Sequence, residues 1–203
     1  MTDAPRAMRG RPRVGSPSLL EEAAFELFLE NGYAGTTVEQ ISTRAGVSRN
    51  TFFNYFAAKS DVFWVGLDAS IDRMAAVLDA ASADTDTDDG VTPIELLRDA
   101  LLDVADRLGP SDVPWVLTHF ELIGSTNEVM ASAIGRATRL SNVIERALGD
   151  SAPAAVSRSL SFACVAAVIA AMTSWAEAGP DRGSLAAHLE RALSPVLAGF
   201  TAL

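Results

Sequence analysis

The sequence contains almost no cysteine or histidine. Of its 203 residues one is cysteine, Cys164, and two are histidines, which excludes an intramolecular disulfide and a multi-cysteine metal site. Cys164 stands in an apolar stretch, where the role of a small buried hydrophobe is favoured over a reactive one. Aromatic residues make up only 7% of the chain although 49% is hydrophobic. Any core must therefore be aliphatic and rich in alanine.

Alternating runs of Val, Ile, Thr and aromatic residues, which are typical of β-strands, are also missing. Glycine and proline stand mostly as single residues between segments whose apolar residues recur at helical spacing. These two observations predict an all-α protein with about nine helices.

Segments that direct a chain to a membrane are lacking as well. The first residues, MTDAPRAMRGRPRVG, have no apolar run of the kind that a secretory signal needs. Residues 160–176 carry no charge, but they are few, mostly alanine, and include Ser161, Thr173 and Ser174. A buried interface helix is favoured over a membrane span, and we expect a cytoplasmic protein with no membrane partner.

Negative charge exceeds positive charge, and the net charge is −10. Residues 1–60 hold seven Lys or Arg against six Asp or Glu, whereas the remainder holds nine against twenty. Four of the seven are the tail arginines Arg6, Arg9, Arg11 and Arg13. A basic arm before a near-neutral head can bind phosphates while an acidic body stays away from them.

Capping residues mark where several helices begin. Ser18 with Glu21, and Thr37 with Gln40, have the spacing of a capping box, in which each side chain accepts from the other residue's backbone N–H. Residues 92–95 (TPIE) combine an N-cap, a proline at the first helical position and a capping-box glutamate.

The order of these signals predicts three parts. Residues 1–15 form a flexible basic tail, 16–57 a three-helix head, and 58–203 a helical bundle. Helices of the bundle are expected near 58–81, 92–108, 112–123, 127–148, 154–177 and 184–201.

Residues 45–48 (AGVS) join two short helices of the head in the pattern of a helix-turn-helix. Gly46 permits the positive φ of the turn, and Val47 supplies the apolar residue that locks the helices together. Ser48 caps the second helix, whose N-terminus can enter the major groove of DNA. A plain three-helix bundle with a solvated polar face is the alternative.

The second short helix carries side chains suited to reading DNA. Arg49 has the geometry for guanine O6 and N7, and Asn50 or Asn54 for adenine N6 and N7. Contacts with phosphate suit Thr37, Tyr55 and Lys59.

Residues 19–64, with NGYAGTTVEQISTRAGVSRNTFFNYFAAKSDVFW at their centre, resemble the DNA-binding region of the TetR family of repressors. Matching features are Gly32-Tyr33, Thr36-Thr37, Ile41, Ala45-Gly46-Val47-Ser48, Thr51-Phe52-Phe53, Tyr55-Phe56 and Lys59. The resemblance implies DNA contacts by Thr37, Arg49, Asn50, Thr51, Phe53, Asn54, Tyr55 and Lys59, beside the capping Ser48. Phe53 departs from the tyrosine of many relatives, so a hydroxyl that reaches phosphate is lost while contact with a thymine methyl remains.

The tail segment Arg9-Gly10-Arg11-Pro12-Arg13 resembles the core of an AT-hook, a motif that reads the minor groove. A narrow Arg-Gly-Arg segment fits an A·T minor groove beside the major-groove helix, which makes Arg11 and Arg13 candidate DNA contacts. A disordered solubilising tail is the alternative.

The resemblance to TetR also implies a homodimer formed by the last two helices and a ligand pocket within each body. Residues 154–177 and 184–201 suit the dimer because their Ala- and Ser-rich surfaces allow helices to approach closely. Core helices of a monomer are the alternative. We expect the dimer, since two-fold half-sites need one and a lone helix-turn-helix seldom binds tightly.

Residues 49–64 and 113–148 are similar to a branch of the family associated with the mycofactocin system, which implies long-chain acyl-coenzyme A as a candidate effector. Candidate pocket residues are Trp64, Trp115, Phe120, Met130 and Phe162 for an apolar ligand, and Arg136 and Arg139 for its phosphates. Ordinary core packing, or a solvated charge, is the alternative for each.

Catalytic patterns are missing from the sequence. His119 and Glu121 are two residues apart, so they would point in different directions on a helix. No nucleophile–base pair, metal cluster or Gly-rich phosphate loop stands out, and we predict no enzymatic activity, cofactor or metal. The predicted function is a repressor released from a palindromic double-stranded operator by a small apolar effector. A DNA-binding protein without an effector, and an enzyme acting in the helical pocket, are the alternatives.

Overall fold

The computed structural model of the chain describes residues 16–83, 91–109, 114, 126–179 and 181–200. These residues form eight α-helices and two short 3₁₀ helices, with no strand among them, which confirms the all-α prediction. The basic tail, the helix expected over 112–123, and the candidate pocket residues Trp115 and Phe120 lie outside the described residues.

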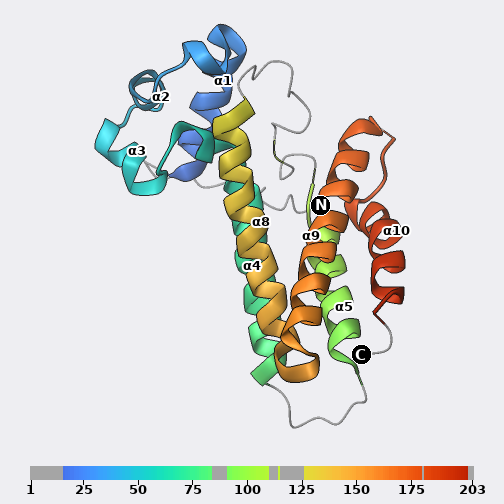
Figure 1. The fold of residues 1–203 in the computed structure, drawn as a ribbon. Helices are drawn as coiled ribbons and strands as arrows, with labels where there is room; N and C mark the ends of the chain where they lie inside the picture. Colours follow the sequence, from blue (N-terminus) through green and yellow to red (C-terminus); the bar gives the residue numbers. More distant parts are fainter. Residues whose placement is uncertain (1–15, 84–90, 110–113, 115–125, 180, 201–203) are drawn as a thin grey trace, which may run out of the picture.

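The first three helices form a compact head (Figure 1, blue to cyan). They are α1 (Pro17–Gly35), α2 (Val38–Arg44) and α3 (Arg49–Tyr55). The expected capping box of Ser18 and Glu21 is wrong: Ser16 is the N-cap, and its Oγ accepts from the N–H of Leu19 at 3.3 Å. The helix begins two residues earlier than expected because Pro17 occupies the first helical position, where its missing N–H costs nothing.

The helix-turn-helix closes through the contacts that its sequence predicts. Gln40 Oε1 accepts from the Thr37 N–H at 2.7 Å, and Thr37 Oγ1 accepts from the Gln40 N–H at 3.2 Å, which confirms the second capping box. Gly46 has a φ of +69°, a conformation that only glycine adopts readily. Ser48 caps α3 by accepting from the Thr51 N–H at 3.1 Å.

The expected continuous helix from residue 58 is wrong in its first turns. Residues Lys59–Trp64 form a 3₁₀ helix, η1, before α4 (Val65–Ala83) begins. Asp61 caps η1 by accepting from the Ala58 N–H at 2.8 Å. Three consecutive side chains of η1, Val62, Phe63 and Trp64, are buried, which a tighter turn achieves more easily than one face of an α-helix.

The body contains α4, α5 (Pro93–Asp106), α8 (Thr126–Leu148), η2 (Gly149–Ser151), α9 (Ala154–Glu177) and α10 (Leu185–Ala198). Helices α4 and α8 lie side by side, and α8 and α10 each pack against α9 (Figure 1). Helix α5 contacts α4, α8 and α10.

Two hydrophobic cores divide the described residues. The body core joins α4, α5, α8, α9 and α10, whereas the head core joins α1, α2, α3 and η1 with Val129 of α8. By packing, η1 therefore belongs with the head, although the predicted boundary lies at residues 57 and 58. Helix α9 is long and apolar enough to cross a membrane by length and composition alone, but it packs as a core helix that buries Leu160 and Trp175.

Candidate nucleic-acid interface and ligand cavity

Helix α3 turns its polar residues to solvent. Arg49, Asn50 and Asn54 are exposed, and so are Phe53 and Tyr55, with 45% and 49% of their surfaces accessible. The helix is held to the head by Phe52, which is fully buried. An exposed polar helix on a rigid apolar anchor is the arrangement by which a helix-turn-helix reads DNA.

Arg49 is oriented by the residue one turn further along α3. Its guanidinium carbon lies 5.3 Å from the centroid of the Phe53 ring, within the range of a cation–π contact. Phe53 in turn meets Phe52 edge to face, with ring centroids 5.5 Å apart. Arg49 is therefore held along the exposed face of α3, the face from which a contact with a base is expected.

Lys59 holds the head together from within. Its Nζ donates to the carbonyl oxygens of Tyr33 at 2.6 Å and Thr36 at 2.9 Å, and it lies 3.9 Å from the centroid of the Tyr33 ring. Burial lowers the pKa of Lys59 and raises the pKa of Tyr33, with the nearby Glu128 carboxylate adding to the second shift. The contact of Lys59 with phosphate stays a prediction, because the carbonyl oxygens of Tyr33 and Thr36 already bind its ammonium group.

Few cations of the head remain for DNA. Residues 16–64 contain three cations and six carboxylates. Arg44 is paired with Glu26 at 3.0 Å and with Glu30 at 2.8 Å, and Lys59 binds α1 carbonyls. Arg49 is then the one cation of the described head without a carboxylate or carbonyl partner. The described head therefore offers few positive charges to a phosphate backbone.

An apolar cavity of about 300 Å³ lies between η1, α4, α8 and α9. Three predicted pocket residues, Trp64, Met130 and Arg136, line this outer cavity. A smaller inner cavity of about 50 Å³ adjoins it and is lined in part by α5 and α10. The two cavities share Leu67, Ile71, Leu140, Val168 and Met172, so they are adjacent, with these side chains between them.

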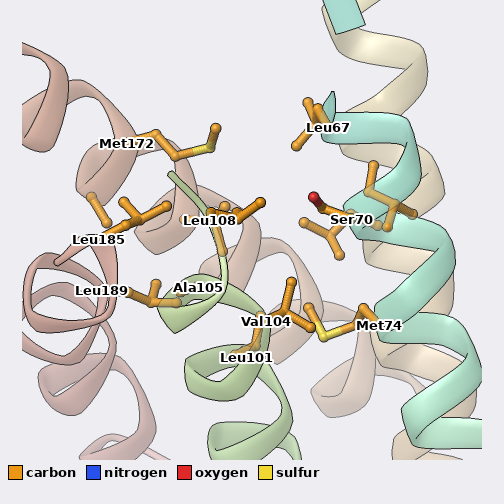
Figure 2. Close-up of a pocket in the computed structure, with 14 residues that line it drawn as sticks. Leu67, Ser70, Met74, Leu101, Val104, Ala105, Leu108, Met172, Leu185 and Leu189 are labelled. Carbon is orange, nitrogen blue, oxygen red and sulfur yellow. The ribbon is translucent and has the colours of Figure 1, made fainter. Parts of the chain in front are cut away.

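The inner cavity is almost entirely hydrocarbon. Figure 2 shows Leu101, Val104 and Met74 converging on it with Leu185 and Leu189. Its single polar lining group among the described residues, the hydroxyl of Ser70, donates to the Gly66 carbonyl at 2.7 Å. The cavity thus suits an apolar chain.

Arg136 connects the wall of the outer cavity with the head. Its Nη1 donates to Asp61 of η1 at 3.2 Å, and its Nη2 donates to Asp68 of α4 at 2.8 Å. The guanidinium also lies 5.4 Å from the Trp64 ring centroid, and only 15% of the side chain is exposed. A residue that lines the cavity therefore bonds directly to the last element of the head.

Two other predicted pocket residues lie elsewhere. Phe162 lines neither cavity and is 54% exposed on α9. Arg139 pairs with Asp72 and Asp68 beside a polar groove on α4 and α8. The shared lining residues were missed as ligand contacts because the same helical stripes are explained equally well by core packing.

Catalytic or metal-binding geometry is not found among the described residues. They contain no group of three or more His, Cys, Asp or Glu that could hold a metal ion. His188 contacts the Ser174 hydroxyl at 3.1 Å and the Arg182 carbonyl at 3.0 Å in the connection between α9 and α10. Burial raises the pKa of the Cys164 thiol to about 12, which makes it a poor nucleophile. His119 lies outside the described residues.

Two protein families match the chain. Residues 20–63 match bacterial regulatory proteins of the tetR family. Residues 91–201, more than half of the chain, match the MftR C-terminal domain. The first match covers the helix-turn-helix, and the second covers α5 to α10.

Individual relatives are transcriptional regulators. A protein named as the mycofactocin biosynthesis transcriptional regulator MftR, from Mycobacterium tuberculosis, is 31% identical over 70 residues, which are 34% of this chain and 35% of that one. The regulator TcmR of Streptomyces glaucescens is 28% identical over 128 residues, covering 61% of this chain and 54% of that one. The chain thus spans between a third and about half of these curated relatives.

Solved structures share the fold along most of the chain. The repressor NalD of Pseudomonas aeruginosa superposes with a TM-score of 0.56 at 20% identity, covering 90% of this chain and 94% of that one. The repressor FadR of Thermus thermophilus, solved in complex with lauroyl-CoA, gives 0.55 at 25% identity and covers 91% and 94%.

Proposed function

The chain belongs to the TetR family of bacterial regulatory proteins, and on that premise we propose that it is a repressor released from a palindromic operator by a small apolar effector. One observation carries the proposal: Trp64 belongs to the core of the DNA-binding head and also lines the outer cavity. A ligand in the cavity therefore touches the head itself. The ligand can change DNA binding only as far as it binds more tightly to one arrangement of the head, competent or not competent for DNA, than to the other.

The proposed operator contacts come from two parts of the chain. The head contributes Thr37, Ser48, Arg49, Asn50, Thr51, Phe53, Asn54, Tyr55 and Lys59. The tail contributes Arg11 and Arg13, which is supported by the shortage of free cations in the described head. Arg49, held against Phe53 at 5.3 Å, is proposed to read a guanine.

The proposed effector is a long apolar chain, with long-chain acyl-coenzyme A as the leading candidate. The two adjacent apolar cavities support this proposal, as do the match to the MftR C-terminal domain and the lauroyl-CoA in the Thermus thermophilus relative. Trp64, Met130 and Arg136 line the cavity, and Trp115 and Phe120 complete the proposed set.

The proposed active form is a cytoplasmic homodimer joined through α9 and α10. The exposed Phe162 and Ile169 on α9, 54% and 52% accessible, support it. Two recognition helices of such a dimer must lie about 34–36 Å apart, one turn of DNA. We propose that the effector changes this separation by moving α4 against α8.

Operator selection from random DNA, followed by titration with lauroyl-CoA at fixed salt, tests the proposal. We expect a palindromic site, and at least a tenfold loss of operator affinity at saturating effector, or about 1.4 kcal/mol. If a bound acyl-coenzyme A leaves operator affinity unchanged, the protein is a DNA-binding protein without an effector of this class. We propose no enzymatic activity and no cofactor, in line with the regulators among its relatives.

A further inference from the structure

Helix α8 contacts the head with one face and lines the outer cavity with the next. Val129 packs in the head core, and Ser132 Oγ donates to Asp61 Oδ1 at 3.0 Å. The cavity-lining face carries Met130, Ala133 and Ala137. Arg136 belongs to both faces, because it lines the cavity and bonds to Asp61.

The two carboxylates on Arg136 are held unequally. Asp68 Oδ2 accepts from Nη2 at 2.8 Å and from Nε at 3.2 Å, whereas Asp61 accepts a single bond from Nη1 at 3.2 Å. Asp61 also accepts from the Ala58 N–H at 2.8 Å and from Ser132. Asp61 therefore keeps partners if it leaves Arg136, and it is the more easily displaced of the two carboxylates.

The lining of the outer cavity has a single charge. Among its described residues Arg136 alone is ionised, and the others are apolar apart from the indole of Trp64. A ligand group that forms a charge-assisted hydrogen bond in this cavity can find a cationic donor only there.

We propose that the effector carries an oxyanion, a carboxylate or a phosphate, that replaces Asp61 on Arg136 and so weakens the contact between the head and α8. This inference rests on the proposed function, and adds the chemistry of the effector's polar group and the bond through which it acts. Asp61 is then a built-in competitor of the effector as well as part of the contact between head and body.

A competitor has a signature that a structural residue lacks: its removal strengthens ligand binding. Asp61→Asn removes the charge but keeps an oxygen that accepts from Ala58, so η1 stays capped. Asp72→Asn is the matched control, because Asp72 pairs with Arg139 and not with Arg136. Arg136→Gln removes the oxyanion partner.

The exchange is tested by titration calorimetry of the full chain with decanoate and decyl phosphate, both below their micelle concentrations, and with decanol below its solubility limit. We expect one of the two oxyanions to bind about three- to tenfold more tightly than decanol, and Asp61→Asn to widen that preference by about the same factor. Asp72→Asn should leave the preference unchanged, and Arg136→Gln should abolish it. Stronger binding of decanoate assigns a carboxylate, and stronger binding of decyl phosphate assigns a phosphate.

Operator affinity completes the test. The preferred oxyanion should weaken operator binding by the unmodified chain. The Asp61→Asn variant should bind the operator more weakly even without ligand, and adding the oxyanion should lower its operator affinity by a smaller factor. The inference is overturned if Asp61→Asn binds the oxyanions no better than Asp72→Asn does. If decanol binds and releases the operator as well as the oxyanions do, the cavity remains the proposed effector site, but the replacement of Asp61 by an oxyanion on Arg136 is wrong. Absence of binding by all three probes overturns the cavity proposal and this inference together.

Discussion

Lys59 joins the end of α1 to the start of η1 through two carbonyl oxygens. Lys59→Met leaves both carbonyls without this donor, so we expect the free energy of unfolding to fall by about 1–3 kcal/mol. Urea denaturation measures the loss, and Arg73→Met, at an exposed position of α4, is the control. Equal stability of the two variants, combined with weaker operator binding by Lys59→Met, would instead assign Lys59 to phosphate.

Cys164 is fully buried in the body core, and burial raises its pKa to about 12. The thiolate that reacts with disulfide reagents is therefore scarce at neutral pH. We expect Ellman's reagent at pH 8 to label the unfolded chain at once and the folded chain only as fast as it opens. Rapid labelling of folded protein would show that α9 does not pack as described.

At the scale of single elements, α9 presents apolar side chains that the described part of the chain leaves uncovered. Phe162→Asp places a charge in the proposed dimer interface, so we expect the dimer to weaken at least about tenfold. Sedimentation at several protein concentrations measures this effect. Leu29→Asp, at a residue of α1 that is 63% exposed, should leave association unchanged; equal behaviour of the two variants would place the interface elsewhere.

Elements that depend on neighbouring residues were predictable from the sequence. The boxes of Thr37 with Gln40 and Thr92 with Glu95 form as expected, because their partners are three residues apart. The capping box expected at Ser18 does not form, because Pro17 takes the first helical position and Ser16 becomes the N-cap. Two local signals, the Ser18 box and Pro17, compete there. The η1 turn was missed since its geometry depends on burial in the head.

The cavity and its connection to the head were not predictable in this way. Arg136 meets Asp68 and Asp61 from 68 and 75 residues away in sequence, and no local pattern encodes such a pairing. Apolar residues that recur at helical spacing predicted helices correctly, but a face that packs and a face that lines a cavity have the same period.

At the scale of the whole molecule, charge separates the two ends of the chain. The described head keeps Arg49 as its one cation without a carboxylate or carbonyl partner, so we expect the tail arginines to supply phosphate contacts. Deletion of residues 1–14 should lower operator affinity and reduce the slope of log K against log salt by about 0.9 for each arginine that reached a phosphate. Replacing Arg6, Arg9, Arg11 and Arg13 with Gln should reproduce the loss at full length. An unchanged slope in both variants would mean that the tail only solubilises.

The head core is completed by Val129, which is synthesised well after the other buried residues of that core. Val129, only 2% exposed, belongs to α8, whereas the rest of that core ends at Trp64. N-terminal domains commonly fold as soon as they emerge during synthesis, but this one lacks part of its interior until α8 has appeared. We therefore expect no newly made chain to engage DNA before the helix that lines its effector cavity exists, so that every binding-competent molecule already carries that wall of its sensor.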